Sequence, residues 1–357
     1  MNIGDEEVWQ IAAGDTDRAY PDLCLRWGVI LFGPGNRGRW PGCEHPLRTD
    51  GWTSRKVGLI RKYHEDVNCG DIVVLKLGKS EVYGVGRVEG PVVWYDDFGD
   101  IDGWDIQFVR RVRWFWQATN GTPQRFSGAL RFGDTIQKLD RTGPVFAWIS
   151  EIPEHATTLP ALPETCLPDE EVRRIEVSKL AEHLFDQGAA AGAINELTDG
   201  MLGLKQVASW YERSGTKPSE RETVAYLVVP LLRTLGWTPQ RMAVEWNNID
   251  IALFDRLPRA DENLAIVVEV KKLGRSCLSA NTQGAEYASR PGREGCNRLV
   301  VTDGIRYGVY VREGDGGFPE TPTAYMNLSR MVEFYPVLDC EGTPEALSLL
   351  AADWQAG

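Results

Sequence analysis

Two acidic residues and a lysine stand out in the second half of the chain because they interrupt strongly apolar sequence. Asp250 lies in "NIDIAL", and Glu269 and Lys271 lie in "LAIVVEVKK". So dense a run of Ile and Val predicts a strand buried on both faces, and residues 269 and 271 project from the same face of it. Two carboxylates with the backbone carbonyl of Val270 would form a hard, oxygen-lined site for Mg²⁺ (or Mn²⁺). Beside such a metal, Lys271 could orient a water and help to deprotonate it.

Three kinds of element have to position these side chains. Residues 218–237, "PSERETVAYLVVPLLRTLGW", have the pattern of an amphipathic helix with one apolar stripe. The segments "VEWNNIDIALF" and "LAIVVEV" are predicted strands, and Asp250 lies beside Glu269 if they pair. A helix is predicted in "SANTQGAEYASR", followed by two strands in "RLVVTDG" and "YGVYVR". This order predicts an α/β core with a mixed sheet.

The arrangement resembles the PD-(D/E)xK nuclease superfamily, with Asp250 as the first acid and residues 269–271 as its Glu-x-Lys element. "SERETVAYLVVPLLRTLGW" is similar to the first helix of the restriction-endonuclease branch, which begins with an active-site glutamate. "QGAEY" resembles the Q-x-x-x-Y motif of that branch, and "LVVTDGIRYGVY" resembles its closing pair of strands. The resemblance covers about residues 218–312.

This resemblance implies a mixed sheet flanked by helices and Mg²⁺-dependent hydrolysis of phosphodiester bonds. The residues to which it assigns a catalytic role are Glu220, Asp250, Glu269, Lys271 and Gln283. The metal ligands would be Asp250, Glu269 and the carbonyl of Val270. Lys272 and Tyr287 would contact the DNA backbone. A packing role for Gln283 and Tyr287, which share one helix face, is the alternative.

Two glutamates compete for the helical position of the site. Ser219 and Glu222 fit a capping box, in which the glutamate bonds back to the backbone of the cap. That gives Glu222 a sufficient structural role. Glu220 shares the apolar stripe that faces the sheet, and its distance to Pro230 fits the family pattern. We therefore expect Glu220 in the site, with Glu222 as the alternative.

The first 150 residues have a different pattern, rich in tryptophan, glycine and short apolar runs. Predicted strands are "VWQIAA", "GVILFG", "DIVVLKL", "EVYGVGRV" and "RRVRWFW". The third and fourth form a hairpin with its turn at residues 78–80. This spacing predicts a small, strongly curved β-domain with little helix.

Aromatic and basic residues gather in the loops of this region. "LFGPGNRGRW" lacks the Gly-Lys-Ser/Thr of a phosphate-binding P-loop, which argues against nucleotide hydrolysis. Its arginines, Arg37 and Arg39, could meet DNA phosphates. Nine of the 13 tryptophans precede residue 151. Loops that carry aromatic rings and carboxylates can hold a flipped base by stacking and by hydrogen bonds to its edge.

The order of elements over about residues 7–118 resembles the EVE-like branch of the PUA superfamily. "VWQIAAGD", "GVILFGPGN" and "RKYHEDVNCGDIVVLKL" are similar to its first strand, its second strand and its helix with the strand that follows. "VYGVGRV" is similar to its next hairpin strand, and "GWDIQFVRRVRW" would close the barrel. Such domains read modified bases. The resemblance implies a pocket formed by Asn36, Trp40, Trp94, Trp104 and Asp105. The alternative is that these tryptophans pack the barrel or its loops.

The chain of 357 residues is too long for one ordinary core. We expect three parts: a PUA-like β-barrel over 1–150, an acidic linker and helical connector over 151–215, and the nuclease domain over 216–357. The net charge of −12 at first argues against nucleic acid. However, residues 151–200 hold 11 acidic and 3 basic residues, a net charge of −8, so the flanking regions are close to neutral.

The N-terminus "MNIGDEEVWQ" lacks the pattern of a signal peptide, and no apolar run reaches the length of a membrane span. Seven cysteines without a CxxC pair are typical of a reducing cytoplasm. Together these features predict a cytoplasmic, prokaryotic, modification-dependent (type IV-like) restriction endonuclease. Its substrate would be double-stranded DNA that carries modified bases, cleaved by a homodimer. A non-cleaving DNA- or RNA-binding module and a repair or RNA-processing nuclease remain as alternatives.

Overall fold

The computed structural model describes residues 3–15, 17–119, 121–128, 130, 133–154, 157–163, 176–186, 188–314 and 316–352, except the side chain of Glu212. The chain divides into two compact units, Met1–Glu164 and Thr165–Gly357. Each unit combines a β-sheet with helices, so the chain is a multidomain protein of mixed α and β structure.

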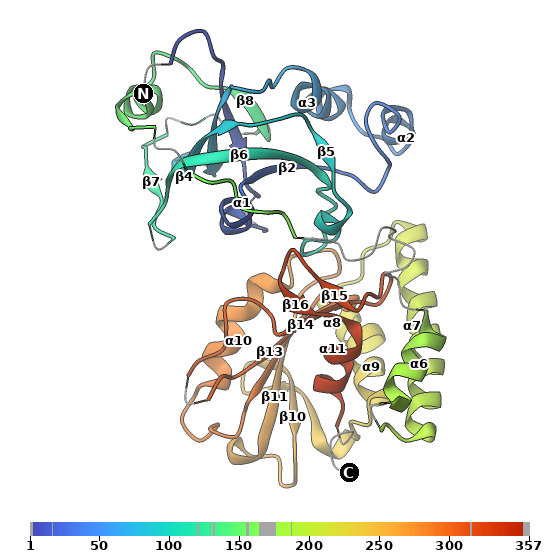
Figure 1. Ribbon diagram of the computed structural model, residues 1–357. Coiled ribbons are helices and arrows are strands. Elements are labelled where there is room, and N and C mark those ends of the chain that lie inside the picture. The colour runs from blue at the N-terminus through green and yellow to red at the C-terminus, as the bar shows by residue number, and fades with distance from the viewer. Residues whose placement is uncertain are drawn as a thin grey trace. The chain divides into compact units, whose positions relative to one another are not determined.

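A curled sheet forms the first unit (Figure 1). Its strands are β1 (Val8–Ala12), β2 (Val29–Phe32), β3 (Ile72–Leu77), β4 (Glu81–Val88), β5 (Val93–Trp94), β6 (Phe108–Gln117), β7 (Gln124–Arg125) and β8 (Ile136–Lys138). The order is β2-β6-β4-β3-β1-β8, with β5 paired to β6 and β7 to β4. Only β1 and β3 are parallel among the described pairs of this sheet. The five strands expected from the sequence are all present, and β3 and β4 form the expected hairpin.

Helices are more prominent in this unit than the sequence indicated. They are α1 (Pro21–Trp27), α2 (Glu44–Thr49), α3 (Ser54–Glu65) and α4 (Pro144–Glu151). Helix α3 begins at Thr53, whose side chain accepts a hydrogen bond from the backbone N–H of Lys56. Its buried Tyr63 donates a hydrogen bond of 2.8 Å to the carbonyl of Ile30 on β2. The expectation of little helix was therefore wrong, because the loops between strands fold into short helices that cover the sheet.

The second unit contains a mixed sheet with β11 near its centre (Figure 1). Its strands are β9 (Met242–Trp246), β10 (Ile249–Phe254), β11 (Leu264–Val270), β12 (Arg298–Thr302), β13 (Arg306–Val311), β14 (Ala324–Asn327), β15 (Phe334–Tyr335) and β16 (Cys340–Glu341). The order is β15-β16-β14-β13-β12-β11-β10-β9. Strand β11 is antiparallel to β10 and parallel to β12. All seven residues of β11 are buried, as its sequence predicts.

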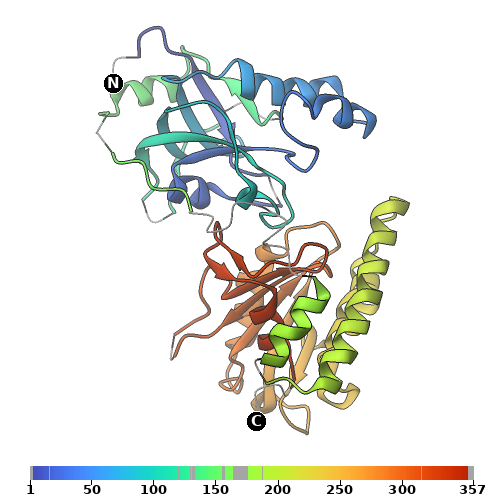
Figure 2. The same cartoon turned by 45° about the vertical axis from the view of Figure 1, so that its right-hand side comes forward.

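Helices cover both faces of this sheet. Helix α10 (Asn281–Ala288) packs on one face, and α6 (Val177–Asp186), α7 (Ala191–Ser214), α9 (Val229–Thr234) and α11 (Thr343–Leu350) contribute to the core on the other. Figure 2 shows α6 and α7 side by side as a helical hairpin. The expected connector helices thus share the core of the second unit, with Leu180, Leu184 and Leu197 buried in it. Most of the expected acidic start of the first of them lies outside the described residues.

The amphipathic helix over 218–237 contains a change of helical geometry. It begins as α8 (Glu220–Thr223), continues as a π-helical segment, η2 (Val224–Val228), and ends as α9. The expected apolar stripe faces the core, with Leu227, Val228 and Leu231 fully buried. Wide π-helical turns are often found at functional sites, and this one lies between the N-terminal turn and the part of the helix that packs on the sheet.

Candidate active site and aromatic cavity

Asp250 and Glu269 are brought together by the pairing of β10 and β11. Ile251 pairs with Val268 in this antiparallel pair, so Asp250, one residue before Ile251, lies opposite Glu269, one residue after Val268. The backbone N–H of Val270 donates a hydrogen bond of 2.7 Å to Oδ2 of Asp250. Both acids belong to the face of the sheet that α10 covers, because Ala252 and Val267 of the same parity lie in the core beneath that helix.

Glu269 is a buried carboxyl with one oxygen that lacks a hydrogen bond. Its side chain is 1% exposed, and its Oε1 atom has no hydrogen-bond partner. Burial, with the nearby Asp250 and Glu220, raises the pKa of Glu269 to about 8, although Lys271 and a hydrogen bond from the Asp250 backbone act to lower it. Burial also raises the pKa of Asp250, against the hydrogen bond from Val270. Two carboxyls that disfavour each other's ionisation form a site that a cation would stabilise.

The two lysines after β11 have different surroundings. Lys271 lowers the pKa of both Asp250 and Glu269, so its ammonium lies within electrostatic reach of both acids. Its backbone N–H donates a hydrogen bond of 2.7 Å to the carbonyl of Thr302. Lys272 instead lowers the pKa of Glu222. The structure therefore separates the two lysines as strand alternation predicts.

Of the two glutamates that could occupy the helical position of the site, Glu222 has a structural role in the cap of α8. The backbone N–H of Ser219 donates to Oε2 of Glu222 at 2.7 Å, and the backbone N–H of Glu222 donates to Oγ of Ser219 at 3.2 Å. This reciprocal pair is the expected capping box. The first of these bonds is the largest cause of the lowered pKa of Glu222. Glu220 is exposed at the start of α8 and is the one of the two that raises the pKa of Glu269.

Helix α10 closes over Glu269. A Cβ atom on Gly284 would lie 3.2 Å from Cγ of Glu269 and 2.3 Å from Cδ1 of Leu299, so the close approach of the helix depends on this glycine. One residue before it, Gln283 donates a hydrogen bond of 3.1 Å from Nε2 to the hydroxyl of Tyr287. The two residues of the Q-x-x-x-Y pattern are thus linked to each other.

Asp303 supports the loops at the ends of β11 and β12, and the sequence did not single it out. It is fully buried. Its Oδ1 accepts from the backbone N–H groups of Ile305 and Arg306, and its Oδ2 accepts from that of Gly274 and from the Arg306 side chain. Asp303 therefore ties the loop that follows Lys271 to the turn after β12. An acid directly after a buried strand, in "VVTDG", was the available signal.

The donors available around Asp250 and Glu269 are oxygen atoms, as Mg²⁺ requires. Among the residues that the structure describes, no group of three or more His, Cys, Asp or Glu side chains could hold a metal ion. The expected site relies on two carboxylates and a backbone carbonyl, and these are hard oxygen donors. The unpartnered Oε1 of Glu269, next to Asp250, is the observation that fits a cation.

An aromatic cavity lies in the first unit, apart from these acids. Its volume is about 900 Å³. The described residues that line it come from β1, the loops around α1 and β2, the start of α3 and the loop before β8. They are Ala12, Gly14, Asp15, Tyr20, Phe32, Gly33, Trp52, Thr53, Arg55, Lys56, Leu59, Trp104, Gly133, Asp134 and Thr135. Of the five pocket residues expected from the sequence, only Trp104 is among them.

Trp40 and Trp94 lie elsewhere because they pack against other groups. Trp40 stacks on His64 at 5.7 Å and donates from Nε1 to Glu65 at 3.1 Å. Trp94 packs edge-on against Phe108 at 5.6 Å and donates from Nε1 to Asp96. The alternative of a packing role suits these two rings better than a place in the cavity.

The remaining expected residues of the first unit lie in its loops. Asn36 is exposed and is not part of the cavity lining. The carbonyl of Asp105 accepts a hydrogen bond of 2.9 Å from the backbone N–H of Gly35. Arg37 is paired with Asp50, and the guanidinium of Arg39 lies 5.8 Å from the Trp94 ring. Both arginines are exposed, as contact with phosphates would require.

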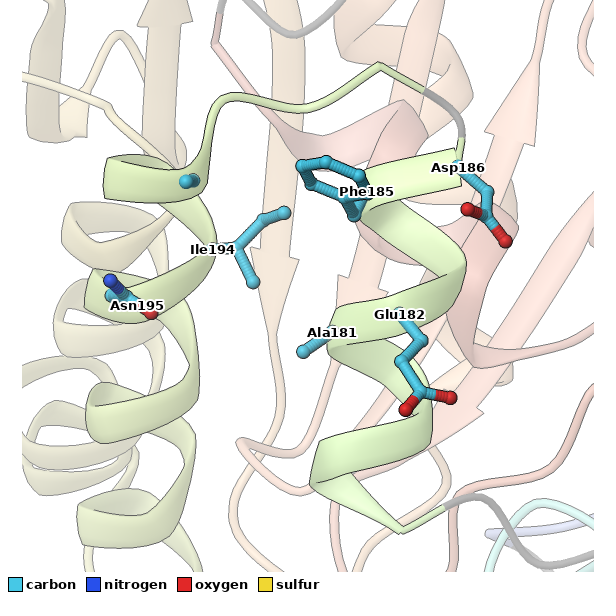
Figure 3. Close-up of a pocket in the computed structure, with 7 residues that line it drawn as sticks. Ala181, Glu182, Phe185, Asp186, Ile194 and Asn195 are labelled. Carbon is cyan, nitrogen blue, oxygen red and sulfur yellow. The ribbon is translucent and has the colours of Figure 1, made fainter.

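A smaller groove of about 490 Å³ lies between α6 and α7. Figure 3 shows the side chains of Phe185 and Ile194 between the two helices, with the carboxylates of Glu182 and Asp186 away from α7. Phe185 is 64% exposed. The groove offers apolar surface without groups that could carry out chemistry.

Comparisons with known proteins give one result for the first unit. Residues 9–139 match a family described as a domain of unknown function (DUF8426). The matched segment includes every described residue that lines the aromatic cavity. No curated protein and no solved structure matches the chain. None of the helices that the structure describes is both long and apolar enough to cross a membrane.

Proposed function

We propose that the chain is a modification-dependent endonuclease of prokaryotic cytoplasm. Its second unit would hydrolyse phosphodiester bonds of double-stranded DNA with Mg²⁺ (or Mn²⁺), and its first unit would bind the modified base. The observation that carries the proposal is the buried, under-bonded Glu269 opposite Asp250, with Lys271 beside both. Two strands with a purely structural role have little reason to place a buried carboxyl, Glu269, beside a half-buried one, Asp250.

Each residue has a role in this proposal. Asp250, Glu269 and the carbonyl of Val270 would hold the metal. Mg²⁺ bound there supplies positive charge that offsets the charge developing on a phosphoryl group. Lys271 donates a hydrogen bond to the attacking water or to a phosphate oxygen. Glu220, exposed at the start of α8, accepts a proton or orients a water at the open side of the site.

The neighbouring residues would hold the substrate. Gln283 and Tyr287, linked on α10, present an amide and a hydroxyl toward the DNA backbone. Lys272 is exposed next to Lys271 and adds positive charge for a phosphate. Since each chain has one such site, cleavage of both strands would use two chains, and we propose a homodimer on DNA.

The experiment is cleavage of phage DNA that contains modified bases, with an unmodified copy and RNA of the same sequence as parallel substrates. We expect Mg²⁺-dependent cutting of the modified DNA only. Asp250→Asn and Lys271→Ala should abolish it, and Glu286→Gln, which changes an exposed acid on α10, should leave it unchanged. Cutting that survives Asp250→Asn would refute the site, and equal cutting of unmodified DNA or of RNA would refute the modification-dependent function.

A further inference from the structure

The aromatic cavity of the first unit is larger than an unsubstituted base requires. Its volume of about 900 Å³ lies near the upper end of the range of about 300–1,000 Å³ that is typical of pockets for drug-sized ligands. A nucleobase is much smaller than such ligands, and so is a base that carries a single methyl group. The ligand that fills this cavity therefore has a second, sizeable part.

One part of the lining suits a flat ring. Tyr20 and Trp104 meet edge to face with their centroids 5.6 Å apart, and Trp52 lies at the start of α3. All three rings are partly exposed. The Arg18 guanidinium lies 5.5 Å from the centroid of Trp104 and the Lys56 ammonium 5.5 Å from that of Trp52, so a base would stack on the opposite face of either ring. Stacking of a base on aromatic side chains is favourable for every base, because every base has a π-face.

The other part of the lining suits hydroxyl groups. Asp15, Asp134 and Thr135 supply oxygen atoms, and Arg55 and Lys56 supply N–H donors. Arg55 is paired with Asp134 at 2.8 Å. The two acids and the two basic residues balance in charge, which favours a neutral polar group over a phosphate. Hydroxyls can donate to the carboxylates and accept from the guanidinium and ammonium groups.

We propose that this cavity binds a DNA base that carries a bulky, hydroxyl-rich substituent, namely a sugar. This inference rests on the proposed function in one respect, because it takes the bound base to be part of DNA. The aromatic rings Trp52, Trp104 and Tyr20 hold the base, and the polar residues around the Arg55–Asp134 pair hold the sugar. The first unit thus selects a DNA base by the size and the hydroxyl content of its modification.

The test is equilibrium binding of the full chain to fluorescent duplexes of one sequence in EDTA, so that cleavage plays no part. Their central cytosine is unmodified, 5-methylated, 5-hydroxymethylated or glucosylated on the hydroxymethyl group. We expect the glucosylated duplex to bind at least about tenfold more tightly than the other three. Trp52→Ala and Trp104→Ala should each weaken binding of the glucosylated duplex by about tenfold to a hundredfold, because each variant loses one base–aromatic stack.

Two further variants separate the cavity from general effects on the fold. Trp40→Ala is the matched control, because Trp40 is an aromatic loop residue of the same unit outside the cavity lining, and it should leave binding unchanged. Ala12→Leu narrows the cavity and should weaken binding of the glucosylated duplex most. Trp52→Phe should retain most of the affinity, and circular dichroism should show that every variant is folded.

The outcomes distinguish this inference from the proposed function. Tightest binding of the methylated or hydroxymethylated duplex would overturn the inference and leave a modification-dependent nuclease in place. Equal loss of affinity in Trp40→Ala and Trp52→Ala would also overturn it. Binding of RNA, or of no modified duplex at all, would overturn it as well. Cleavage in Mg²⁺ would then decide separately whether the second unit is a nuclease.

Discussion

Neutralising Glu269 should stabilise the metal-free second unit at neutral and alkaline pH. Glu269 is 1% exposed, and burial together with Asp250 raises its pKa to about 8 from an ordinary value of 4.5. The folded protein therefore retains a proton that the unfolded chain has lost. The resulting contribution to stability is complete below pH 4.5 and is lost as the pH rises through 8. In Glu269→Gln this dependence is absent.

The magnitude follows from the linkage between proton binding and folding. With pKa values of about 8 and 4.5, the contribution of Glu269 to the free energy of unfolding falls by about 3 kcal/mol between pH 5 and pH 8. Within this pH range, a folded-state pKa one unit lower would reduce this figure by about 1 kcal/mol, and one unit higher would add about 0.4 kcal/mol. The difference in the free energy of unfolding between Glu269→Gln and the wild type should thus shift by about 3 kcal/mol in favour of the variant as the pH rises from 5 to 8.

Hydrogen exchange measured by mass spectrometry on peptides of β11 in EDTA would report the second unit alone. Saturating Mg²⁺ should flatten the pH dependence of the wild type, because a ligand of the folded state stabilises it by mass action. Glu222→Gln is the matched control. The pKa of Glu222 is lowered by its hydrogen bonds to Ser219, so loss of this carboxylate should destabilise the protein above its unfolded-state pKa.

A Glu269→Gln protein with the same pH dependence as the wild type would refute the reasoning. So would a loss of stability on neutralisation at pH 8. Either result would mean that Glu269 is already paired in the folded protein, and the argument for a cation beside Asp250 would fail with it.

Three further predictions concern other parts of the chain. Gly284→Ala places a Cβ 2.3 Å from Leu299 and 3.2 Å from Glu269. Denaturant titrations should therefore show a loss of about 1–3 kcal/mol in the stability of the second unit. Calorimetry should show weaker binding of Mg²⁺. Ser219→Ala removes the cap of α8 and should cost about 1 kcal/mol in the same titrations. Burial lowers the pKa of His64 to about 4 from 6.5, so the unfolded chain gains a proton first as the pH falls. Between pH 7 and pH 5 the wild-type first unit should lose about 1 kcal/mol more stability than His64→Phe, measured by hydrogen exchange.

The longer elements could be predicted because their patterns are strong. The dense β-branched sequence of β11 and the alternation of glycine with apolar residues in β4 each favour one conformation. The short elements gave no such signal. Helix α2 has no side-chain cap and contains Pro46, and β15 and β16 have two residues each. Such elements form only because neighbouring strands and helices hold them.

The candidate site was predictable where local geometry determines it. Strand alternation separated Lys271 from Lys272, and the capping box assigned Glu222, because both depend on neighbours within three residues. The long-range role of Asp303 was missed because its bond to Gly274 joins two loops that the sequence does not bring together. Helices α6 and α7 were expected as a connector, although the apolar spacing of α6 at Val177, Leu180 and Leu184 indicates a face that must be buried.

The composition of the sequence does not predict which tryptophans line the aromatic cavity. Nine tryptophans in the first 150 residues indicate that some of them bind a ligand or fill a core, but they do not indicate which. Trp40 stacks on His64, 24 positions later, whereas Trp52 lines the cavity. These positions depend on how α2 and α3 pack on the sheet, which is a tertiary property. Of the tryptophans expected in a base pocket, Trp104 lines this cavity.

The pairing of β1 determines when the first unit can fold during synthesis. Trp9 pairs with Val73, and Ile11 pairs with Ile136, 125 positions later. The ribosome therefore releases an apolar strand long before either of its partners exists. The β3–β4 hairpin is local and can form early, while contacts so distant in sequence form slowly. Until β8 emerges, the edge of β1 that pairs with β8 stays open to other nascent chains, so slower translation beyond β4 should increase the demand for chaperones.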